Sequence, residues 1–498
     1  MKKVVVIGGG LGGLSAAISL AALPGYHITL IEKNAHLGGK LNVKDVKGFS
    51  FDLGPSILTM PHIFEALFAK HHKKMSDYIQ IQPVRPHWRN FFEDGNIIDL
   101  THKIDDMLIN KQLTKADLED LKNYYAYTEK IYGVSAMVAF DNQLENTWEA
   151  MRFKPSVSIF SNMDYFATMD QGVRRYIKNP YLIDIINYFI KYVGSSPYDA
   201  PALMNLLPYI QWKYDLWYVK GGMFNISKGM VKLIQELPQI KVRTKTEVVS
   251  VEKGTRHINA IKLSNGETIQ ADLIVSNMEA IPFYEKITKE SKGLIAKYQR
   301  KFEPACSGFA LHLGTDKVYP QLAHHNFFYS ANSKKNFKNI FHKHKLNEDP
   351  TIYLVAPIRT DPSQGPKGGD IIKILPHIPY LDPKRPFTKQ DYATFRENIL
   401  IKLERMGLTD LRKHIVVEEL WTPETIQDMY YSNRGSIYGI VASKNKNMGF
   451  KIPKRSKLYD NVYFVGGSVN PGGGMPMVVL SGQQVVEQIL NNEKTKVS

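Results

Sequence analysis

Cysteine is nearly absent from this chain, which has one cysteine among its 498 residues. A single thiol, Cys306, cannot close an internal disulfide or build a cysteine-based structural metal site, so the composition fits a reducing compartment. Long apolar runs are missing too, since no uninterrupted stretch reaches the roughly 18 residues that span a bilayer. The first apolar run, Val4–Ile7, is cut by glycine far short of a signal-peptide core. We therefore expect a cytoplasmic protein.

The rest of the composition is that of an ordinary globular protein. Hydrophobic residues make up 43% of the chain and charged residues 22%, and the length suggests about two to three domains. The formal net charge of +16 indicates either a solvated surface or attraction to acidic lipid or nucleic acid. No helix-turn-helix, zinc-finger or RNP-like pattern accompanies the basic residues, so nucleic acid is the disfavoured partner.

A glycine-rich loop near the N-terminus carries the first specific pattern. It follows a β-branched run that predicts a buried strand, and it precedes a predicted helix over residues 14–21. Three of its glycines fit the spacing G-x-G-x-x-G, which allows a tight turn, close approach to a pyrophosphate and close packing of helix on strand. The helix start would then present unpaired N–H groups to the phosphates. The predicted cofactor residues of this loop are Gly8, Gly10, Leu11, Gly12 and Gly13.

An acidic residue follows the loop at the expected place. A second predicted strand, His27–Ile31, ends in Glu32, near the spacing of about 20 residues at which dinucleotide sites place their ribose-binding acid. A carboxylate there accepts hydrogen bonds from both ribose hydroxyls and repels a 2′-phosphate. The order of strand, glycine loop, helix, strand and acid predicts a Rossmann-type dinucleotide site rather than an isolated turn.

The next residues indicate which dinucleotide is bound. Gly38-Gly39-Lys40 and the segment Asp52–Pro55 resemble the extended motif of the amine oxidase and carotenoid desaturase superfamily of flavoproteins. The resemblance implies that FAD is the cofactor, that Gly39 and Lys40 face it, and that the main chain at Val248 holds the adenine. The family commonly has arginine at the position of Lys40, and lysine keeps the charge but not the bidentate geometry.

A second glycine-rich loop lies near the C-terminus. Residues 466–474 join a predicted strand, Val462–Val465, to a helix predicted to begin at Met475, which again directs a helix N-terminus at an anion. The resemblance implies that this loop, with Gly467 and Ser468, lies under the flavin. It also implies that N–H groups near Met475 face the flavin pyrimidine, where partial positive charge stabilises the reduced cofactor.

Four further segments resemble a narrower family, the bacterial 4,4′-diaponeurosporene oxygenases. They are residues 51–61, 191–201, 322–328 and 470–477. The last reads Asn-Pro-Gly-Gly-Gly from Asn470, where desaturases usually read His-Pro-Gly-Ala-Gly, and this favours the oxygenase.

The resemblance implies FAD-dependent oxidation of the terminal methyl group of a C30 carotenoid, 4,4′-diaponeurosporene, to the aldehyde, in staphyloxanthin-type biosynthesis. A dehydrosqualene or phytoene-type desaturase and a flavin-binding scaffold without turnover are the alternatives. Removal of hydride from an allylic methyl group leaves a cation that the polyene delocalises. We expect water to capture it, with dioxygen as the rival source of oxygen.

Two segments suggest how a long apolar substrate would be handled. Apolar residues of segment 182–193 fall on one face of a predicted helix, and Asp184, Asn187 and Lys191 lie between them. Ordinary core packing explains such a stripe more often than a carotenoid tunnel. Segment 444–457 alternates cations with single apolar side chains. It is a candidate for peripheral contact with anionic lipid on the inner face of the cell membrane, and a solvated basic loop is the alternative.

No catalytic acid or base stands out, so catalytic residues stay unassigned. His324 and His325 are adjacent, and neighbours on a strand point to opposite faces, so we predict a structural role and no metal site. The resemblance makes Glu303, Asp199 and Arg434 pocket candidates, although a structural or solvated role is expected for each.

These patterns predict an α/β fold, α+β overall. We expect a Rossmann-type FAD-binding domain built from residues 1–65, 205–280 and 425–498. A helical substrate-access region is expected at residues 66–204, and a substrate-binding sheet domain at residues 281–424.

Overall fold

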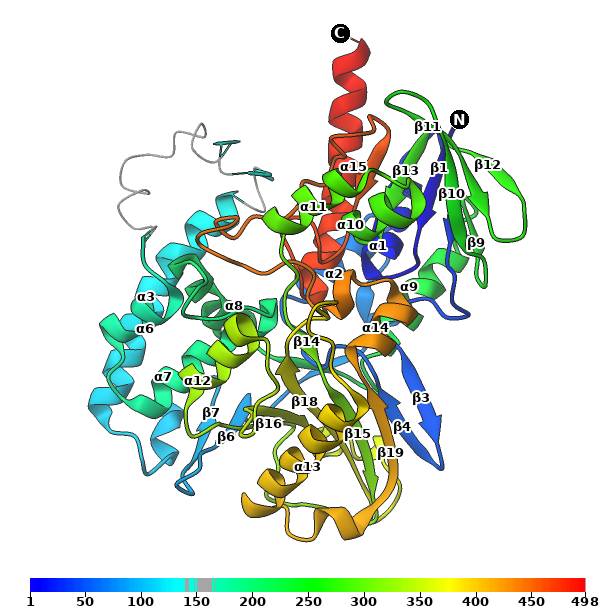
Figure 1. Cartoon of the computed structure of the whole chain (residues 1–498). Coiled ribbons are helices and arrows are strands. Elements are labelled where there is room, and N and C mark those ends of the chain that lie inside the picture. Colours follow the sequence, from blue (N-terminus) through cyan, green and yellow to red (C-terminus); the bar gives the residue numbers. More distant parts are fainter. Residues whose placement is uncertain (139–142, 147, 150–163, 165, 498) are drawn as a thin grey trace.

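The computed structural model describes residues 1–138, 143–146, 148–149, 164 and 166–497. Part of the predicted helical region therefore lies outside the described residues. Figure 1 shows a parallel sheet in the upper part of the molecule, a mixed sheet in the lower part and a group of helices beside them.

The parallel sheet has five strands in the order β20-β13-β1-β2-β9, and every neighbouring pair is parallel. Its strands are β1 (Lys2–Ile7), β2 (Tyr26–Ile31), β9 (Ile240–Arg243), β13 (Leu273–Ser276) and β20 (Val462–Phe464). The apolar run of β1 is fully buried, as expected for a strand covered on both faces. Because the strands are parallel, chain segments far apart in sequence bring their carboxyl ends to one edge.

Two helices from opposite ends of the chain pack together beside this sheet. Helix α1 (Leu11–Ala21) lies against α15 (Met475–Val497), the long C-terminal helix of Figure 1. The Ser15 hydroxyl donates a hydrogen bond of 2.7 Å to the Val479 carbonyl. A Cβ added to Gly482 would lie 2.6 Å from the Gly12 carbonyl oxygen. Small residues therefore set the close approach of the two helices.

A three-stranded antiparallel sheet adjoins the parallel one. Its strands are β10 (Val248–Lys253), β11 (Ile258–Leu263) and β12 (Thr268–Gln270). In the connection of β11 to β12, the Leu263 N–H donates to the Glu267 carbonyl, and Gly266 has φ of +86°, the left-handed conformation typical of the last residue of a three-residue hairpin loop.

The mixed sheet has eight strands in the order β19-β15-β18-β17-β16-β6-β7, and β14 pairs with β18. All neighbouring pairs are antiparallel except β16 with β6. The strands are β6 (Trp88–Phe91), β7 (Ile97–Leu100), β14 (Ser307–Gly308), β15 (Ala310–Thr315), β16 (His325–Phe328), β17 (Ile352–Val355), β18 (Asp370–Ile378) and β19 (Ile415–Trp421). A parallel sheet together with this mixed sheet and its helices confirms the predicted fold class.

Two strands of the mixed sheet come from the region expected to be helical. Strands β6 and β7 lie at one edge of the mixed sheet. Their apolar side chains, including those of Trp88, Ile98 and Leu100, are buried against the rest of the fold, which is why this segment forms strands.

Helices surround the sheets. In the part of the chain that the structure describes, those of eight or more residues, besides α1 and α15, are α2 (His62–Ala69), α3 (Lys115–Ala136), α6 (Met169–Tyr176), α7 (Pro180–Asn187), α8 (Leu206–Tyr214), α9 (Asn225–Gln235), α11 (Lys292–Lys301), α13 (Lys389–Arg405) and α14 (Pro423–Tyr430). Shorter elements include α10 (Ala280–Pro282), α12 (Ser333–Lys338) and the ribbons formed by β3 (Val43–Val46) with β4 (Phe49–Asp52) and by β5 (Ile81–Pro83) with β8 (Trp217–Val219). Helices α3, α6, α7 and α8 gather on the left in Figure 1.

The predicted helix over residues 182–193 consists of α7 followed by 3-10 turns over Tyr188–Val193. The Asn179 side chain caps α7 by accepting hydrogen bonds from the first backbone N–H groups. The expected polar face is wrong at two positions, because Asn187 and Lys191 are each only 2% exposed. Other elements of the fold also cover the side of the helix that carries Asn187 and Lys191. The apolar face of segment 182–193 is therefore not opposed by a solvent-exposed face at these positions.

Candidate functional site

The first glycine loop joins the carboxyl end of β1 to α1. Gly8 has φ of +94°, a conformation that favours glycine. A Cβ added to Gly13 would lie 2.1 Å from the Gly8 carbonyl oxygen, and one on Gly10 would lie 2.6 Å from the Asn277 side-chain nitrogen. No side chain caps the start of α1 at Gly10, so the helix presents backbone N–H groups and the positive end of its dipole there.

Glu32 follows β2 beside this loop and is 6% exposed. Its two carboxylate oxygens accept hydrogen bonds from the backbone N–H groups of Gly9 and Asn34, each at 2.8 Å. These bonds fix the carboxylate and leave further lone pairs for the hydroxyl groups of a ligand.

The loop and Glu32 border a cavity of about 310 Å³, which we call the glycine-lined cavity. Most residues predicted to bind the cofactor lie in its wall. They are Gly8, Gly10, Leu11, Glu32, Gly39, Lys40, Val248, Gly467 and Met475.

Three other predicted cofactor residues lie behind this wall. The Gly13 N–H donates to the Asn277 side-chain oxygen at 2.9 Å, and Gly12 packs under α15. Ser468 is 3% exposed, and its carbonyl accepts a hydrogen bond of 3.3 Å from the Ile452 N–H. These three residues are not in the lining of the glycine-lined cavity, and each packs against neighbouring parts of the chain.

Asn277 and Glu279 are lining residues that the sequence analysis missed. Asn277 follows β13, and its side chain contacts Gly13 and Gly10 of the first loop. The position of Asn277 directly after a strand was a signal for its role. Strand β13 is the parallel neighbour of β1, and residues that follow adjacent parallel strands line the same crevice.

Lys40 extends along the wall of the glycine-lined cavity. Its Nζ donates hydrogen bonds to the carbonyls of Ser436 and Ile437 at 3.2 and 3.3 Å, and it lies 3.8 Å from a Glu279 carboxylate oxygen. Burial lowers the pKa of Lys40 and raises the pKa of Glu279, and each charge partly offsets the effect on the other.

The second glycine loop brings the start of α15 to the same cavity. A Cβ added to Gly439 would lie 2.4 Å from the Gly467 carbonyl oxygen, and one on Gly473 would lie 2.8 Å from that of Tyr438. Two backbone segments therefore touch here, and α15 begins at Met475 with its positive dipole end at the cavity.

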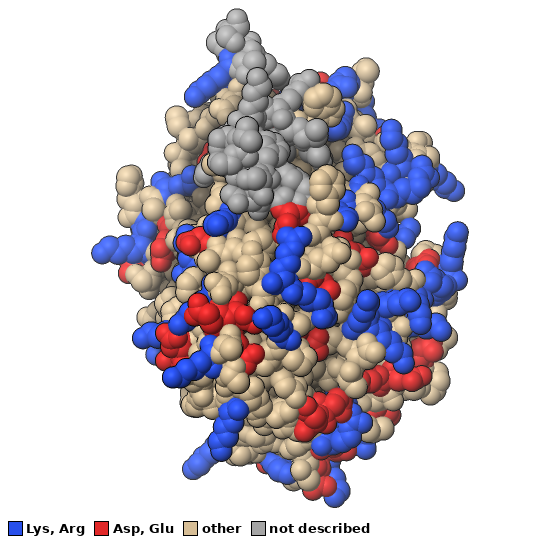
Figure 2. All heavy atoms as spheres, turned by 90° about the vertical axis from the view of Figure 1, so that its left-hand side faces the viewer, with Lys and Arg blue, Asp and Glu red and all other residues tan. Residues whose placement is uncertain are grey.

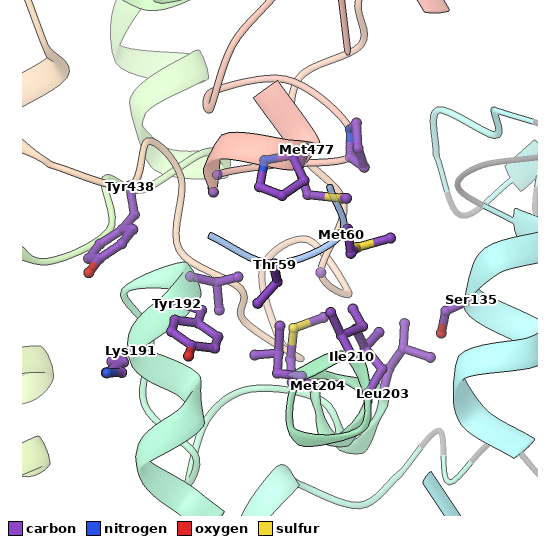
Figure 3. A pocket seen from close by; sticks show the side chains of 18 of the residues that line it. Thr59, Met60, Ser135, Lys191, Tyr192, Leu203, Met204, Ile210, Tyr438 and Met477 are labelled. Atoms are coloured by element: carbon purple, nitrogen blue, oxygen red, sulfur yellow. The ribbon is translucent and has the colours of Figure 1, made fainter. Parts of the chain in front are cut away.

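A second cavity of about 600 Å³, which we call the apolar cavity, adjoins the first. Met60, Leu203, Met204, Ile210 and Met477 contribute side chains to its wall (Figure 3). The residues that line both cavities are Gly54, Pro55, Lys373, Leu375, Tyr438, Gly473, Gly474 and Met475. We call this set of residues the shared wall. It includes Met475, so α15 begins where the apolar cavity and the glycine-lined cavity meet.

Lys373 of β18 is the charged side chain of the shared wall. Its Nζ donates to the Gly54 carbonyl and contacts the Ser56 hydroxyl oxygen at 3.2 Å. Burial lowers the pKa of Lys373 to about 8, with a smaller opposing effect from the charge of Asp52. The sequence analysis gave no reason to single out this residue.

The basic segment 444–457 is partly internal. Lys451 is 4% exposed and donates to the Ile440 carbonyl at 2.7 Å, while Lys454 is 1% exposed and pairs with Glu145. The prediction of surface cations is wrong at these two positions, because the fold buries both amino groups against acceptors outside the segment. Residues 448–450 of the segment line the apolar cavity.

The paired histidines are buried inside the fold. The rings of His324 and His325 lie 4.4 Å apart between centroids, closer than expected for side chains on opposite faces. His324 bonds to the Thr360 hydroxyl at 2.8 Å and His325 to the Tyr353 hydroxyl at 2.9 Å. These contacts are structural.

The pocket candidates named from the resemblance also have structural partners. Glu303 pairs with Lys446, Asp199 with His342 at 2.9 Å, and the Arg434 side chain donates to Gln299 at 3.2 Å. None of the three lines either cavity in the described part of the chain.

Within the described ranges, one group of potential metal ligands lies close together: His87, His102 and Asp215. The Arg85 guanidinium binds both Asp215 carboxylate oxygens, at 2.8 and 2.6 Å. The carboxylate therefore already has a cationic partner.

Comparison with known proteins identifies the family. A family model described as flavin-containing amine oxidoreductase matches residues 11–490. The chain belongs to this family. Membership confirms FAD as the cofactor of this flavin-containing oxidoreductase.

Relatives of this flavoprotein cover its full length. It is 56% identical over 492 residues to a 4,4′-diapolycopene oxygenase of Methylomonas sp, with 98% of each chain covered. It is 50% identical over 489 residues to a 4,4′-diaponeurosporene oxygenase of Staphylococcus aureus (strain Newman), again with 98% of each covered. An oxidoreductase structure from Methanosarcina mazei shares the fold, with a TM-score of 0.64 at 15% identity over 97% of this chain and 100% of the other.

The glycine-lined cavity of this flavoprotein fits FAD. Its wall contains backbone positions where a side chain would collide, a fixed carboxylate and two helix starts. Glu32 would hold the ribose, the start of α1 the phosphates and the start of α15 the flavin ring. The flavin ring would then lie at the shared wall, where the two cavities meet.

Proposed function

We propose that this flavoprotein oxidises the terminal methyl group of a C30 carotenoid, 4,4′-diaponeurosporene, to the aldehyde. The observation that carries the proposal is the apolar cavity of about 600 Å³ that shares a wall with the glycine-lined cavity. A rod-like hydrocarbon needs apolar walls along its length and one end at the cofactor. The names of the full-length relatives support the same substrate class.

The chain's own contribution would be to bind, orient and exclude water. Aliphatic and thioether side chains of the apolar cavity remove the polyene from water, which favours binding in proportion to the apolar area covered. The shared wall directs the end of the polyene toward the start of α15. Bound FAD supplies the capacity to accept a hydride from that end.

Expression beside a C30 carotenoid pathway tests the proposal. Mass spectrometry of the pigment should show the gain of oxygen and loss of hydrogen that convert a methyl group into an aldehyde. Loss of hydrogen alone would indicate a desaturase instead, and unchanged pigment in the presence of bound FAD would indicate a scaffold without turnover.

The relative from Methylomonas sp gives a specific reason to test a second polyene, because its name states 4,4′-diapolycopene. The purified holoenzyme should be given 4,4′-diaponeurosporene and 4,4′-diapolycopene in separate assays. The ratio of the two kcat/KM values assigns the preferred substrate, and oxidation of both ends of 4,4′-diapolycopene would identify the broader activity.

We also propose peripheral contact with anionic lipid at the rim of the apolar cavity, on the inner face of the cell membrane. Within the described residues, no helix is both long and apolar enough to cross a membrane. Phe166 is 93% exposed and lines this cavity, and the Lys444 side chain donates to its carbonyl at 2.8 Å. An exposed aromatic beside cations suits a lipid headgroup boundary.

Flotation of the protein with vesicles tests this contact. The face that carries α3 and α6 mixes basic with acidic side chains (Figure 2), so binding should depend on the rim more than on overall charge. Phe166→Ser should weaken binding to anionic vesicles, whereas Ile109→Ser, at another exposed apolar residue, should not. Equal binding by wild type and Phe166→Ser would overturn the assignment of the rim.

A further inference from the structure

Lys191 carries a buried amino group at the wall of the apolar cavity. The residue is 2% exposed, and its Nζ has no hydrogen-bond partner among the described residues. It lies 3.8 Å from the ring centroid of Phe327, 4.0 Å from that of Tyr353 and 4.3 Å from that of Trp88. Aromatic faces therefore surround an amine that has three donor hydrogens when protonated and two when neutral.

The two hydroxyl groups beside this amine are already engaged. The Tyr353 hydroxyl bonds to His325 Nδ1 at 2.9 Å, and the Tyr192 hydroxyl donates to Gln211. Burial lowers the pKa of Lys191 well below its usual range, while the ring faces favour the cation. In neither protonation state does the amine have an acceptor among the described residues, and an unpaired buried donor is costly.

The position of Lys191 connects it to the reacting end of the cavity. Its neighbour Tyr353 pairs in register with Leu375 across β17 and β18, and Leu375 belongs to the shared wall. Figure 3 shows Lys191 beside Tyr192 and on the same side of the cavity as Tyr438, another residue of the shared wall. The unpaired amine is therefore close to the place where the two cavities meet.

We propose that the Lys191 amino group binds the oxygen of a polyene whose terminal carbon is already oxidised, as the alcohol or the aldehyde. This inference rests on the proposed function and adds a site for the oxygenated end. A hydrocarbon offers the amine no acceptor, whereas a terminal oxygen accepts its hydrogen bond. The site therefore prefers the product of the first oxidation over the starting polyene and retains it for the second.

The test compares Lys191→Met with wild type as purified holoenzymes. Methionine keeps the apolar stem and removes only the donor. Titration with the C30 hydrocarbon and with its terminal aldehyde should give an unchanged Kd for the hydrocarbon and a Kd for the aldehyde about tenfold to a hundredfold weaker, the loss expected for one buried hydrogen bond. Lys122→Met, at an exposed position of α3 that pairs with Asp105, should change neither constant.

Two further readouts separate binding of oxygen from support of the fold. Donation to a conjugated carbonyl shifts the visible absorption of a polyenal to longer wavelength, so the aldehyde bound to wild type should absorb at longer wavelength than the aldehyde bound to Lys191→Met. During turnover, Lys191→Met should release more terminal alcohol. Equal weakening of both ligands, or unchanged aldehyde binding and absorption, would overturn the inference. A wild type that oxidises no C30 polyene would instead overturn the proposed function.

Discussion

The two cavities that meet at the start of α15 are built in opposite ways. The glycine-lined cavity is shaped by main chain, and an added Cβ on Gly13 would lie 2.1 Å from a carbonyl oxygen. The apolar cavity is shaped by side chains, including those of Met60, Ile210 and Met477, contributed by separate segments. A wall of backbone constrains which residue can stand at a position, whereas a wall of side chains constrains mainly volume and polarity.

Gly13→Val should have the largest effect, because it tests the backbone wall directly. A branched side chain would collide with the Gly8 carbonyl, so α1 could not pack on β1. We expect protein without bound FAD, measured by flavin absorbance after gel filtration. The matched control is Gly133→Ala in α3, where an added Cβ meets nothing within 4 Å. Normal flavin content in Gly13→Val would contradict the backbone account.

Glu32→Gln should weaken FAD binding by about tenfold to a hundredfold. Both carboxylate oxygens accept backbone N–H groups, and an amide would turn one acceptor into a donor that faces another donor. Titration of apoprotein with FAD measures the change. Glu252→Gln, at an exposed ion pair with Lys262, should leave the affinity for FAD unchanged. Equal affinity in Glu32→Gln and wild type would remove this carboxylate from the site.

Ile210→Trp should impair use of the polyene without affecting the binding of FAD. The larger side chain fills part of the apolar cavity, so kcat/KM for the C30 polyene should fall by about tenfold while flavin content stays normal. Ile401→Trp, at a position of α13 that is 51% exposed, is the control. Loss of FAD in Ile210→Trp would show that the cavities are not independent.

Lys373→Met should have the smallest effect, and we expect to measure it in how the free energy of unfolding varies with pH. The folded-state pKa of Lys373 is about 8, below its usual value of 10.5. Between these values the unfolded chain binds a proton that the folded protein releases, so this lysine makes the free energy of unfolding rise with pH. Denaturant unfolding from pH 8 to 10.5 should show a shallower rise in Lys373→Met, by up to about 1.4 kcal/mol per pH unit. Identical slopes would contradict the burial of this amine.

The same contrast explains what the sequence could predict. The glycine spacings, the acid at Glu32 and the helix that begins at Met475 follow from local backbone requirements, and the structure places these residues around one cavity. The apolar cavity left no comparable signal, because its lining consists of ordinary core residues. Burial of Lys191 and Lys454 was also beyond the sequence, since their surroundings are set by residues far along the chain.

A crystal structure of the holoenzyme with a bound C30 polyene tests the central claim most directly. The account predicts that the polyene occupies the apolar cavity and that its terminal carbon contacts the flavin ring at the shared wall, within about 4 Å. A polyene bound with both ends away from the shared wall, or a flavin ring that lies elsewhere, would contradict it.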